Sequence, residues 1–291
     1  MPIEVKNISH IYMENTPYEK KALNNVSLTI NEGEFVAIAG HTGSGKSTLM
    51  QHFNGLLNPT RGEVFIDGID INKKKDKKTL HARRSVGMVF QYPEHQLFEE
   101  TVFDDVAFGP RNLGLSVDEV QERVETALTC VGLNFSEIAK RSPFRLSGGQ
   151  MRRVAIAGVI ALQPEYLVLD EPSAGLDPCG RDEIYAQILQ LYRNTGMAVV
   201  LVTHNMEDVA RMAKRLLVMD HGRIRFDGPP VDLFHDETIQ LQDFGVSLPH
   251  VTSLLKTLRT HGLDLNDTLQ DVEVVAEAIR SAINRKRDSS C

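Results

Sequence analysis

The sequence predicts an α/β fold built on a largely parallel sheet. The runs 166–169 and 197–202 are apolar throughout, which is typical of strands buried on both faces. Residues 3–8 and 22–30 instead alternate apolar and polar side chains, which indicates antiparallel strands. Apolar residues recur at helical spacing from about 97 to 160. We therefore expect an α/β core that carries an antiparallel β subdomain and a helical subdomain.

A glycine-rich loop follows the apolar run 34–39 directly, and a helix is predicted after it at residues 47–56. Glycines let the backbone curl so that successive N–H groups point inward, and the helix adds its positive end. Lys46 can then reach terminal phosphates, and the Ser47 hydroxyl can ligate Mg²⁺, which is the mechanics of a Walker A motif. The loop residues are Gly40, His41, Thr42, Gly43, Ser44, Gly45, Lys46, Ser47 and Thr48.

Length, charge and cysteine content limit the alternatives. The 291 residues suit one large domain with a smaller addition, and a net charge of -7 gives no general reason to expect binding to nucleic acid or to an anionic membrane. The longest apolar stretch, residues 154–162, is far short of the roughly 20 residues of a membrane span, and the first residues do not resemble a signal peptide. We therefore expect a cytoplasmic protein. Cys130, Cys179 and Cys291 form no CxxC pair, so neither disulfides nor zinc are expected of them.

An aromatic residue in the first predicted loop is a candidate for contact with a nucleotide base. Tyr12 follows the first strand, and its ring could stack on a base. Tyr18 is a rival for the same role, and an exposed tyrosine without a ligand is the alternative for both. The basic run 73–78 is short and interrupted, so we expect a solvated loop there.

A polar residue ends the strand predicted at residues 86–90, which follows another at 63–68. Gln91 stands where this strand gives way to a loop, so its amide can ligate Mg²⁺ or orient water. Large apolar groups then occupy residues 92–98 and 102–108. Core packing is the default explanation for each of them, and an apolar groove for a partner's helix is the alternative.

The predicted helical subdomain, residues 92–162, shows one clear apolar face, formed by Val120, Val124, Leu128 and Val131. Near its end, a glycine pair predicts a second anion site. Ser147 is a typical helix-capping residue, the two glycines expose N–H groups, and the helix that follows aims its positive end at the same place. A plain cap would explain Ser147 but not the whole Leu-Ser-Gly-Gly-Gln string. The site residues are Ser147, Gly148, Gly149 and Gln150.

Two carboxylates follow the buried strand at residues 166–169. Mg²⁺ beside a triphosphate would make a buried Asp170 tolerable, and Glu171 can hold the attacking water as general base. We expect the roles to divide because neighbouring strand residues point in opposite directions. The next apolar strand ends at His204, which we expect at the same sheet edge, where it could hydrogen-bond a terminal phosphate.

Two amphipathic helical patterns follow residue 235, where the composition becomes acidic and polar. Short amphipathic helices cannot bury their faces alone, so residues 236–291 are expected to form a small accessory region that packs on the core, residues 1–235, or on another subunit. We favour association with another subunit. The apolar positions are Val251, Leu254, Leu255 and Leu258 in the first pattern and Leu269, Val272, Ala276, Ile279 and Ile283 in the second.

In order and spacing, these motifs resemble the nucleotide-binding subunit of ATP-binding cassette (ABC) transporters, over residues 1 to about 235. The resemblance implies a P-loop NTPase core. It also implies Walker A, Q-loop, signature, Walker B, D-loop and H-loop roles, with Asp177 in the D-loop. In this family each ATP lies between the Walker A loop of one subunit and the signature serine of its partner, so one motif set needs a second copy or a sister. The matching positions are residues 40–48, Gln91, 146–150, Asp170, Glu171, 173–177 and His204.

A narrower resemblance rests on residues 91–102, on residues 108–110 and on the helical tail. These are similar to the ATPases of energy-coupling factor (ECF) transporters, which take up vitamins and metal ions, and the Met-Arg-Arg at 151–153 is similar to their second, A-prime kind. This implies a heterodimer with a sister ATPase at the cytoplasmic face of the cell membrane. It also implies a transmembrane coupling protein seated near residues 91–98 and a separate substrate-binding membrane subunit.

The resulting hypothesis is an importer ATPase that uses ATP and Mg²⁺: ATP closes a dimer, Glu171 activates water, and opening moves the membrane partner. Catalytic roles are expected for Glu171, His204 and Gln91, and metal ligation for Ser47, Gln91 and Asp170. The alternatives are a homodimeric ATPase of a cobalt, nickel or conventional ABC importer and, less favoured, a soluble ABC ATPase acting on ribosomes or DNA. A hydrolytically silent module would be expected to lack Glu171 or His204.

Overall fold

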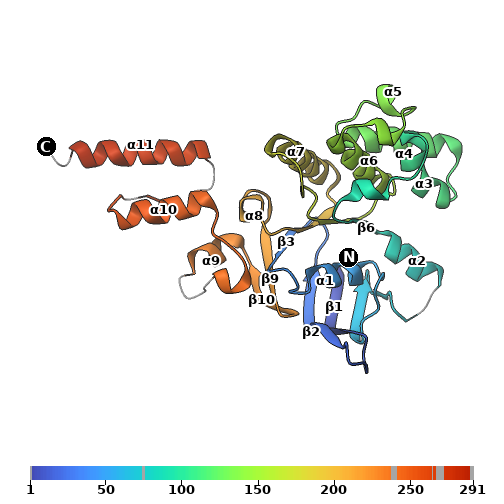
Figure 1. The fold of residues 1–291 in the computed structure, drawn as a ribbon, viewed down its shortest axis with the longest axis horizontal. Helices are drawn as coiled ribbons and strands as arrows, with labels where there is room; N and C mark the ends of the chain where they lie inside the picture. Colours follow the sequence, from blue (N-terminus) through green and yellow to red (C-terminus); the bar gives the residue numbers. More distant parts are fainter. Residues whose placement is uncertain (1, 74–75, 237–240, 264, 267–271, 289–291) are drawn as a thin grey trace.

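The computed structural model describes residues 2–73, 76–236, 241–263, 265–266 and 272–288 (Figure 1). Its centre is a six-stranded sheet with the order β10-β9-β3-β8-β7-β6, in which every neighbouring pair is parallel except β9 with β10. The carboxyl ends of the five parallel strands therefore meet at one edge, as predicted. The strands are β3 (Phe35–Ala39), β6 (Val86–Val89), β7 (Tyr166–Asp170), β8 (Ala198–Val202), β9 (Arg215–Asp220) and β10 (Arg223–Gly228).

Both faces of this sheet are covered, which explains the unbroken apolar runs in its strands. On β7, Leu167 and Leu169 face the core of the helical subdomain, while Val168 faces a second core shared with the antiparallel sheet and the first helix. Side chains alternate along a strand, so a strand that is covered on both faces must be apolar at every position.

A four-stranded antiparallel sheet with the order β2-β1-β4-β5 packs on one side of the core sheet (Figure 1). Its first strand extends further than the alternating pattern predicted, because β1 resumes pairing with β2 beyond irregularities in register. Tyr12 is therefore the last residue of a strand and does not lie in a loop. The strands are β1 (Ile3–Tyr12), β2 (Lys20–Ile30), β4 (Arg61–Ile66) and β5 (Ile69–Asp70).

The helical subdomain lies beyond β6 and β7 (Figure 1). The predicted apolar face is confirmed, because Val120, Val124, Leu128 and Val131 are all buried in its core. The helices up to β9 are α1 (Lys46–Phe53), α2 (Lys77–Arg84), η1 (Pro93–Gln96), α3 (Val102–Asn112), α4 (Val117–Cys130), α5 (Phe135–Ile138), η2 (Pro143–Arg145), α6 (Gly148–Ile160), α7 (Pro178–Thr195) and α8 (Met206–Met212).

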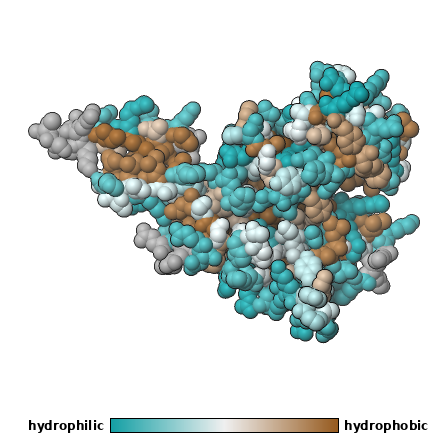
Figure 2. Space-filling view, in the orientation of Figure 1, coloured by the Kyte–Doolittle hydropathy of each residue, from teal (hydrophilic) through white to brown (hydrophobic). Residues whose placement is uncertain are grey.

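A pair of helices extends away from the core at the C-terminal end (Figure 1). After α9 (Pro230–His235) and η3 (Leu241–Phe244), α10 (His250–Thr260) and α11 (Val272–Asp288) share a small core of their own around Leu255, Leu265 and Val275. Leu269 lies outside the described residues. Apolar side chains gather on the surface of the pair (Figure 2), and Leu254, Val272 and Val274 are among the exposed ones. Over the part of the chain described, no helix meets the length and apolar character of a membrane span.

Candidate active site

The phosphate loop bends where only glycine fits. Gly40 has φ +140°, and a Cβ there would lie 2.2 Å from the Met219 carbonyl oxygen. Gly45 has φ +106° and would meet the Ala22 carbonyl oxygen at 2.6 Å. Side chains are excluded at both positions, so the backbone can curl tightly before α1 begins. A cavity of about 160 Å³ lies above the loop, lined by Tyr12, Lys20, Ala22, Gly43, Gly45, Lys46, Ser47 and Thr48.

Lys46 lies inside the curl of the loop. Its ammonium donates to the carbonyl oxygens of Gly40 at 2.7 Å and of His41 at 3.0 Å. Burial lowers the pKa of Lys46, although the carboxylates of Asp170 and Glu171 act in the opposite direction. A desolvated cation beside inward-facing N–H groups is suited to bind an anion.

The oxygen atoms beside Lys46 suit a hard cation. The Ser47 hydroxyl donates to Asp170 Oδ2 at 3.4 Å. Burial, and then the neighbouring charge of Glu171, raise the pKa of Asp170, so a positive charge bound there would stabilise its carboxylate. The buried Ser44 hydroxyl makes no hydrogen bond within the described chain. Hydroxyl and carboxylate oxygens are the ligands that Mg²⁺ prefers, so these residues fit that ion.

Glu171 and His204 are in direct contact. His204 follows β8, and its Nδ1 lies 2.7 Å from Glu171 Oε1, with the imidazole 71% exposed. The physical reason predicted for the divergence of Asp170 and Glu171 was wrong. β7 ends at Asp170, and Glu171 has φ +45° while its N–H donates to the Val202 carbonyl. A left-handed turn, and not strand alternation, therefore directs Glu171 toward β8.

Two other predicted residues, Gln91 and Asp177, take no part in the contact between Glu171 and His204. Gln91 follows the end of β6 and is exposed, and within the described residues no hydrogen bond joins it to the other candidate side chains. Asp177 is exposed and caps α7, where its carboxylate accepts from the Gly180 N–H at 2.7 Å. The same sheet edge thus carries Gln91 without placing it in contact with Asp170 or Glu171.

The predicted second anion site is the exposed start of α6. Ser147 accepts from the Gln150 N–H at 3.3 Å, and the Gln150 side chain accepts from the Ser147 N–H at 3.1 Å. This capping box accounts for Gln150 as well as Ser147, which the sequence interpretation did not foresee. It does not account for the glycine pair: a Cβ at Gly148 or Gly149 would meet nothing within 4 Å, so packing within the chain does not require glycine at either position.

Tyr12 reaches the phosphate loop, whereas Tyr18 does not line its cavity. The Tyr12 hydroxyl lies 3.2 Å from Thr48 Oγ1, while Tyr18 is 79% exposed. Lys20 also lines this cavity and was missed. Lys20 pairs with Tyr12 across β1 and β2, and the register irregularities between them hid that neighbour from the sequence pattern.

Sequence reasoning also missed a buried arginine that joins three segments. Arg152, on α6, makes two hydrogen bonds to Glu94 of η1, at 2.9 and 2.7 Å. It also donates to the carbonyl oxygens of Pro172, at 3.2 Å, and Ala174, at 2.6 Å. Burial is the largest influence and raises the pKa of Glu94, but the hydrogen bonds and charge of Arg152, together with a backbone hydrogen bond and the charge of His95, hold that pKa below its ordinary value. Arg152 thus ties the start of α6 to the segments after Gln91 and after Glu171.

The large apolar groups of residues 92–108 divide between core and surface. Leu97, Val102 and Val106 are buried, as the default explanation predicted. Phe98 and Phe108 are 57% and 47% exposed and contact each other edge to face, with ring centroids 5.0 Å apart. We use the name aromatic surface patch for Phe98 and Phe108 together with the exposed Tyr92, which precedes η1.

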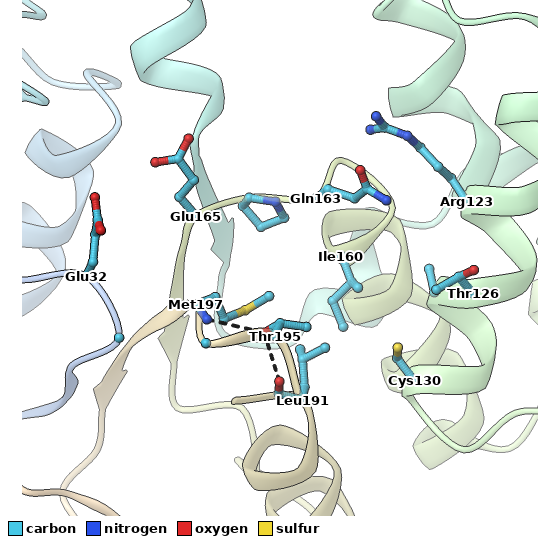
Figure 3. Close-up of a pocket in the computed structure, with 14 residues that line it drawn as sticks. Glu32, Arg123, Thr126, Cys130, Ile160, Gln163, Glu165, Leu191, Thr195 and Met197 are labelled. Carbon is cyan, nitrogen blue, oxygen red and sulfur yellow. Dashed lines mark hydrogen bonds between the residues drawn. The ribbon is translucent and has the colours of Figure 1, made fainter. Parts of the chain in front are cut away.

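Cavities larger than the one above the phosphate loop lie elsewhere on the described chain. A cavity of about 530 Å³ lies at the opposite edge of the sheet (Figure 3). Arg123 and Cys130 of α4 lie on one side of it, and Glu165 and Met197, which precede β7 and β8, on the other. It contains none of the predicted site residues.

The phosphate loop and the glycine pair, which are the two anion sites predicted from the sequence, lie on different parts of the molecule, and this arrangement indicates the class. The phosphate loop and the carboxylates lie at the sheet edge, while the glycine pair starts a helix of the helical subdomain and faces outward. A core of this kind with a helical subdomain is the architecture of ABC ATPases. Residues 23–174 match the family model described as ABC transporter.

Relatives narrow this assignment. The energy-coupling factor transporter ATP-binding protein EcfA2 of Clostridium tetani is 50% identical over 286 residues, covering 98% of this chain and 99% of its own. The protein of that name from Caldanaerobacter subterraneus subsp. tengcongensis is 51% identical over 279 residues, covering 96% of each chain. The chain belongs to the ABC transporter family, among the energy-coupling factor transporter ATP-binding proteins.

Solved structures agree with this fold. CbiO1 from Clostridium perfringens, part of the ABC transporter complex cbiONQ, superposes with a TM-score of 0.72 at 36% identity, covering 87% of this chain and 98% of its own. The ATP-binding cassette MJ0796, in a dimeric post-hydrolysis state bound to ADP and Pi, gives a TM-score of 0.69 at 32% identity, covering 78% and 98%. The predicted ABC ATPase fold is therefore confirmed.

Proposed function

We propose that this chain is the ATP-hydrolysing subunit that energises an ECF-type membrane importer for vitamins or other micronutrients. The observation that carries the proposal is the arrangement at the sheet edge: Lys46 and Ser47 beside Asp170, and Glu171 in contact with His204. This arrangement supplies an anion site, hard oxygen ligands and a general base within one cluster.

Each residue has a distinct part in hydrolysis. Lys46 binds the terminal phosphates through charge-assisted hydrogen bonds. Ser47, Asp170 and Gln91 are the residues that would hold Mg²⁺, and the bound ion supplies positive charge that stabilises the phosphate oxygens. Glu171 accepts the proton of the attacking water.

His204 orients the base. Its Nδ1 faces Glu171 Oε1, so the opposite nitrogen is free to face the terminal phosphate. Tyr12, at the rim of the phosphate cavity, is placed to stack on the nucleotide base.

Dimerisation completes the site. The outward-facing glycine pair at the start of α6 is suited to bind the phosphates of a nucleotide held by another subunit. ATP held between the phosphate loop of one subunit and the glycine pair of the other closes the dimer. Loss of the terminal phosphate weakens the association of the two subunits, which gives a two-state switch.

The partners follow from the family and from two exposed apolar surfaces. We assign the aromatic surface patch to a transmembrane coupling protein, which would hold this subunit at the cytoplasmic face of the membrane, with a separate substrate-binding membrane subunit beyond it. A sister ATPase is expected as the other half of a heterodimer. The C-terminal helices, with exposed Leu254, Val272 and Val274, are suited to strengthen that association.

One substitution tests hydrolysis and closure together. Glu171→Gln keeps the shape of the side chain but removes the base, so ATP should bind without turnover and hold a closed dimer, seen as a larger species by size-exclusion chromatography. Glu165→Gln is the matched control, because this glutamate is exposed at the opposite end of β7. Undiminished turnover in Glu171→Gln would contradict the assigned base.

A homodimeric ATPase of a cobalt or nickel importer is the second candidate, favoured by the likeness to CbiO1 of the cbiONQ complex. The mass of the purified membrane complex and the identity of its ATPase subunits distinguish the two. Recovery with two copies of this chain would support the homodimer, and recovery with a different ATPase the heterodimer. Recovery with ribosomes would refute the transport proposal.

A further inference from the structure

Two histidines and an aspartate converge at the start of the phosphate loop, and the ATPase cycle proposed above assigns no role to their side chains. His41 follows β3, and Asp220 ends β9, its parallel neighbour. The register sets Ala39 opposite Val218, so its continuation brings His41 level with Asp220. His221 is next along the turn that leads into β10. One nitrogen of each histidine and an oxygen of Asp220 all lie within 4.8 Å of one another.

The spacing of these atoms matches that of ligands shared by one ion, and the contact of His41 with Asp220 is at the long end of the range for a direct hydrogen bond. Asp220 Oδ1 lies 3.2 Å from His41 Nε2 and 3.6 Å from His221 Nε2. Two ligands on one tetrahedral Zn²⁺, with bonds of about 2.1 Å, lie about 3.4 Å apart. A charge-assisted N–H···O bond is usually about 2.7–2.9 Å.

Other histidine–carboxylate pairs in this chain do make that short bond. His204 approaches Glu171, and His250 approaches Glu207, each at 2.7 Å. The longer contacts at Asp220 are therefore a local feature of this cluster.

The hydrogen bonds around the cluster orient its atoms for ligation. His41 Nδ1 lies 2.8 Å from the Thr42 carbonyl, so this nitrogen carries a proton, and in the neutral imidazole with that proton the lone pair of Nε2 faces Asp220. In that tautomer two lone pairs oppose each other across 3.2 Å, which is unfavourable unless a cation lies between them. Metal-binding histidines commonly donate their other N–H to a carbonyl in this way. Arg225 donates to Asp220 Oδ2, at 3.2 Å, and leaves Oδ1 to the histidines.

We infer that His41, Asp220 and His221 form a site for a transition-metal ion of the Zn²⁺ type. Imidazole nitrogens with one carboxylate oxygen are a donor set that suits Zn²⁺ and not Mg²⁺. The His221 side chain is 82% exposed, so the ion can enter from solvent and keep a position for water. This inference does not depend on the proposed function.

The position of the site suggests what the ion does. The Gly222 N–H donates to the Ser44 carbonyl at 2.8 Å, so the β9–β10 turn already supports the phosphate loop. The carbonyl of His41 accepts from Lys46. An ion shared by His41 and His221 would join the loop and the turn through side chains as well, and so restrain the loop.

Zinc titration of the full-length, tag-free protein in excess Mg²⁺ tests the site, by calorimetry or competition with a chelating dye. We expect one tight Zn²⁺ per chain, and visible absorption bands of tetrahedral or five-coordinate form when Co²⁺ replaces it. His221→Asn should weaken binding about 100-fold or more, beyond the 10–100-fold loss typical when only a supporting partner is removed. Asparagine also tolerates the φ of +45° at this position.

Two comparisons make the result decisive. His250→Asn removes an exposed histidine that also contacts a carboxylate, so it should leave the tight site intact. Asp220→Asn keeps the side-chain shape but removes the charge, so it should weaken binding as His221→Asn does. No tight Zn²⁺ in the wild-type protein, or equal affinity in His221→Asn, would overturn the inference and leave a proton shared by His41 and Asp220 as the explanation of their contact.

Discussion

Replacing Arg152 by alanine should destabilise this protein more than any neighbouring surface substitution. The Arg152 side chain is 3% exposed and its partner Glu94 is 15% exposed, so the pair is largely shielded from water. Removing one member of a buried ion pair typically costs about 3–5 kcal/mol, because the other charge stays buried without a partner. The carbonyls of Pro172 and Ala174 would also lose a donor. This cost is a large part of the roughly 5–15 kcal/mol that stabilises a typical domain.

Urea unfolding followed by circular dichroism measures this effect. With a slope of about 3 kcal/mol/M, the midpoint should fall by about 1 M or more. Arg153→Ala is the matched control on the next residue of α6. Its ion pair with Glu183 is 3.9 Å long and its partner is 54% exposed, so its loss should cost no more than about 1 kcal/mol. Equal midpoints for the two variants would refute the reasoning.

The remaining predictions concern the phosphate loop and its helix. Lys46→Ala should weaken ATP binding about 10- to 100-fold, because a charged hydrogen-bond donor is lost. Titration with a fluorescent nucleotide measures this affinity, and an unchanged value would contradict the role of Lys46 in phosphate binding. Tyr12→Ala should weaken it about 5- to 100-fold while Tyr12→Phe and Tyr18→Ala do not, and the reverse order would assign stacking to Tyr18. Burial lowers the pKa of His52 from 6.5 to about 4, so only the unfolded chain binds this proton between those values. The free energy of unfolding should therefore fall by about 3 kcal/mol as the pH drops from 6.5 to 4. His52→Gln should flatten this dependence on pH, and an unchanged dependence would assign it to another group.

The sheet edge could be predicted because it follows from local patterns. A run that is apolar at every position must be covered on both faces, and parallel strands bring their carboxyl ends together. Asp170 therefore ends one strand, His204 follows the adjacent strand, and the glycine loop follows a third. No long-range contact had to be known in advance.

What the sequence left hidden depends on contacts between distant segments. The direction of Glu171 depends on a backbone turn at one residue, and the side-chain period of a strand says nothing about it. The approach of Tyr12 to Thr48 depends on irregular pairing between β1 and β2. The sequence does not separate Arg152 from the neighbouring Arg153, whereas the burial of Arg152 and its hydrogen bonds to Glu94, Pro172 and Ala174 do.

The burial of Arg152 has a consequence for how η1, α6 and the segment after Glu171 move. Its guanidinium, carried by α6, makes four hydrogen bonds of 3.2 Å or shorter: two to Glu94 of η1, and one each to the carbonyl oxygens of Pro172 and Ala174 in the segment that follows Glu171. Moving any of these segments alone would leave a buried charge unpaired, at a cost that thermal motion rarely supplies. A force on the aromatic surface patch beside η1 would therefore displace the exposed glycine pair and the loop after Glu171 as one unit.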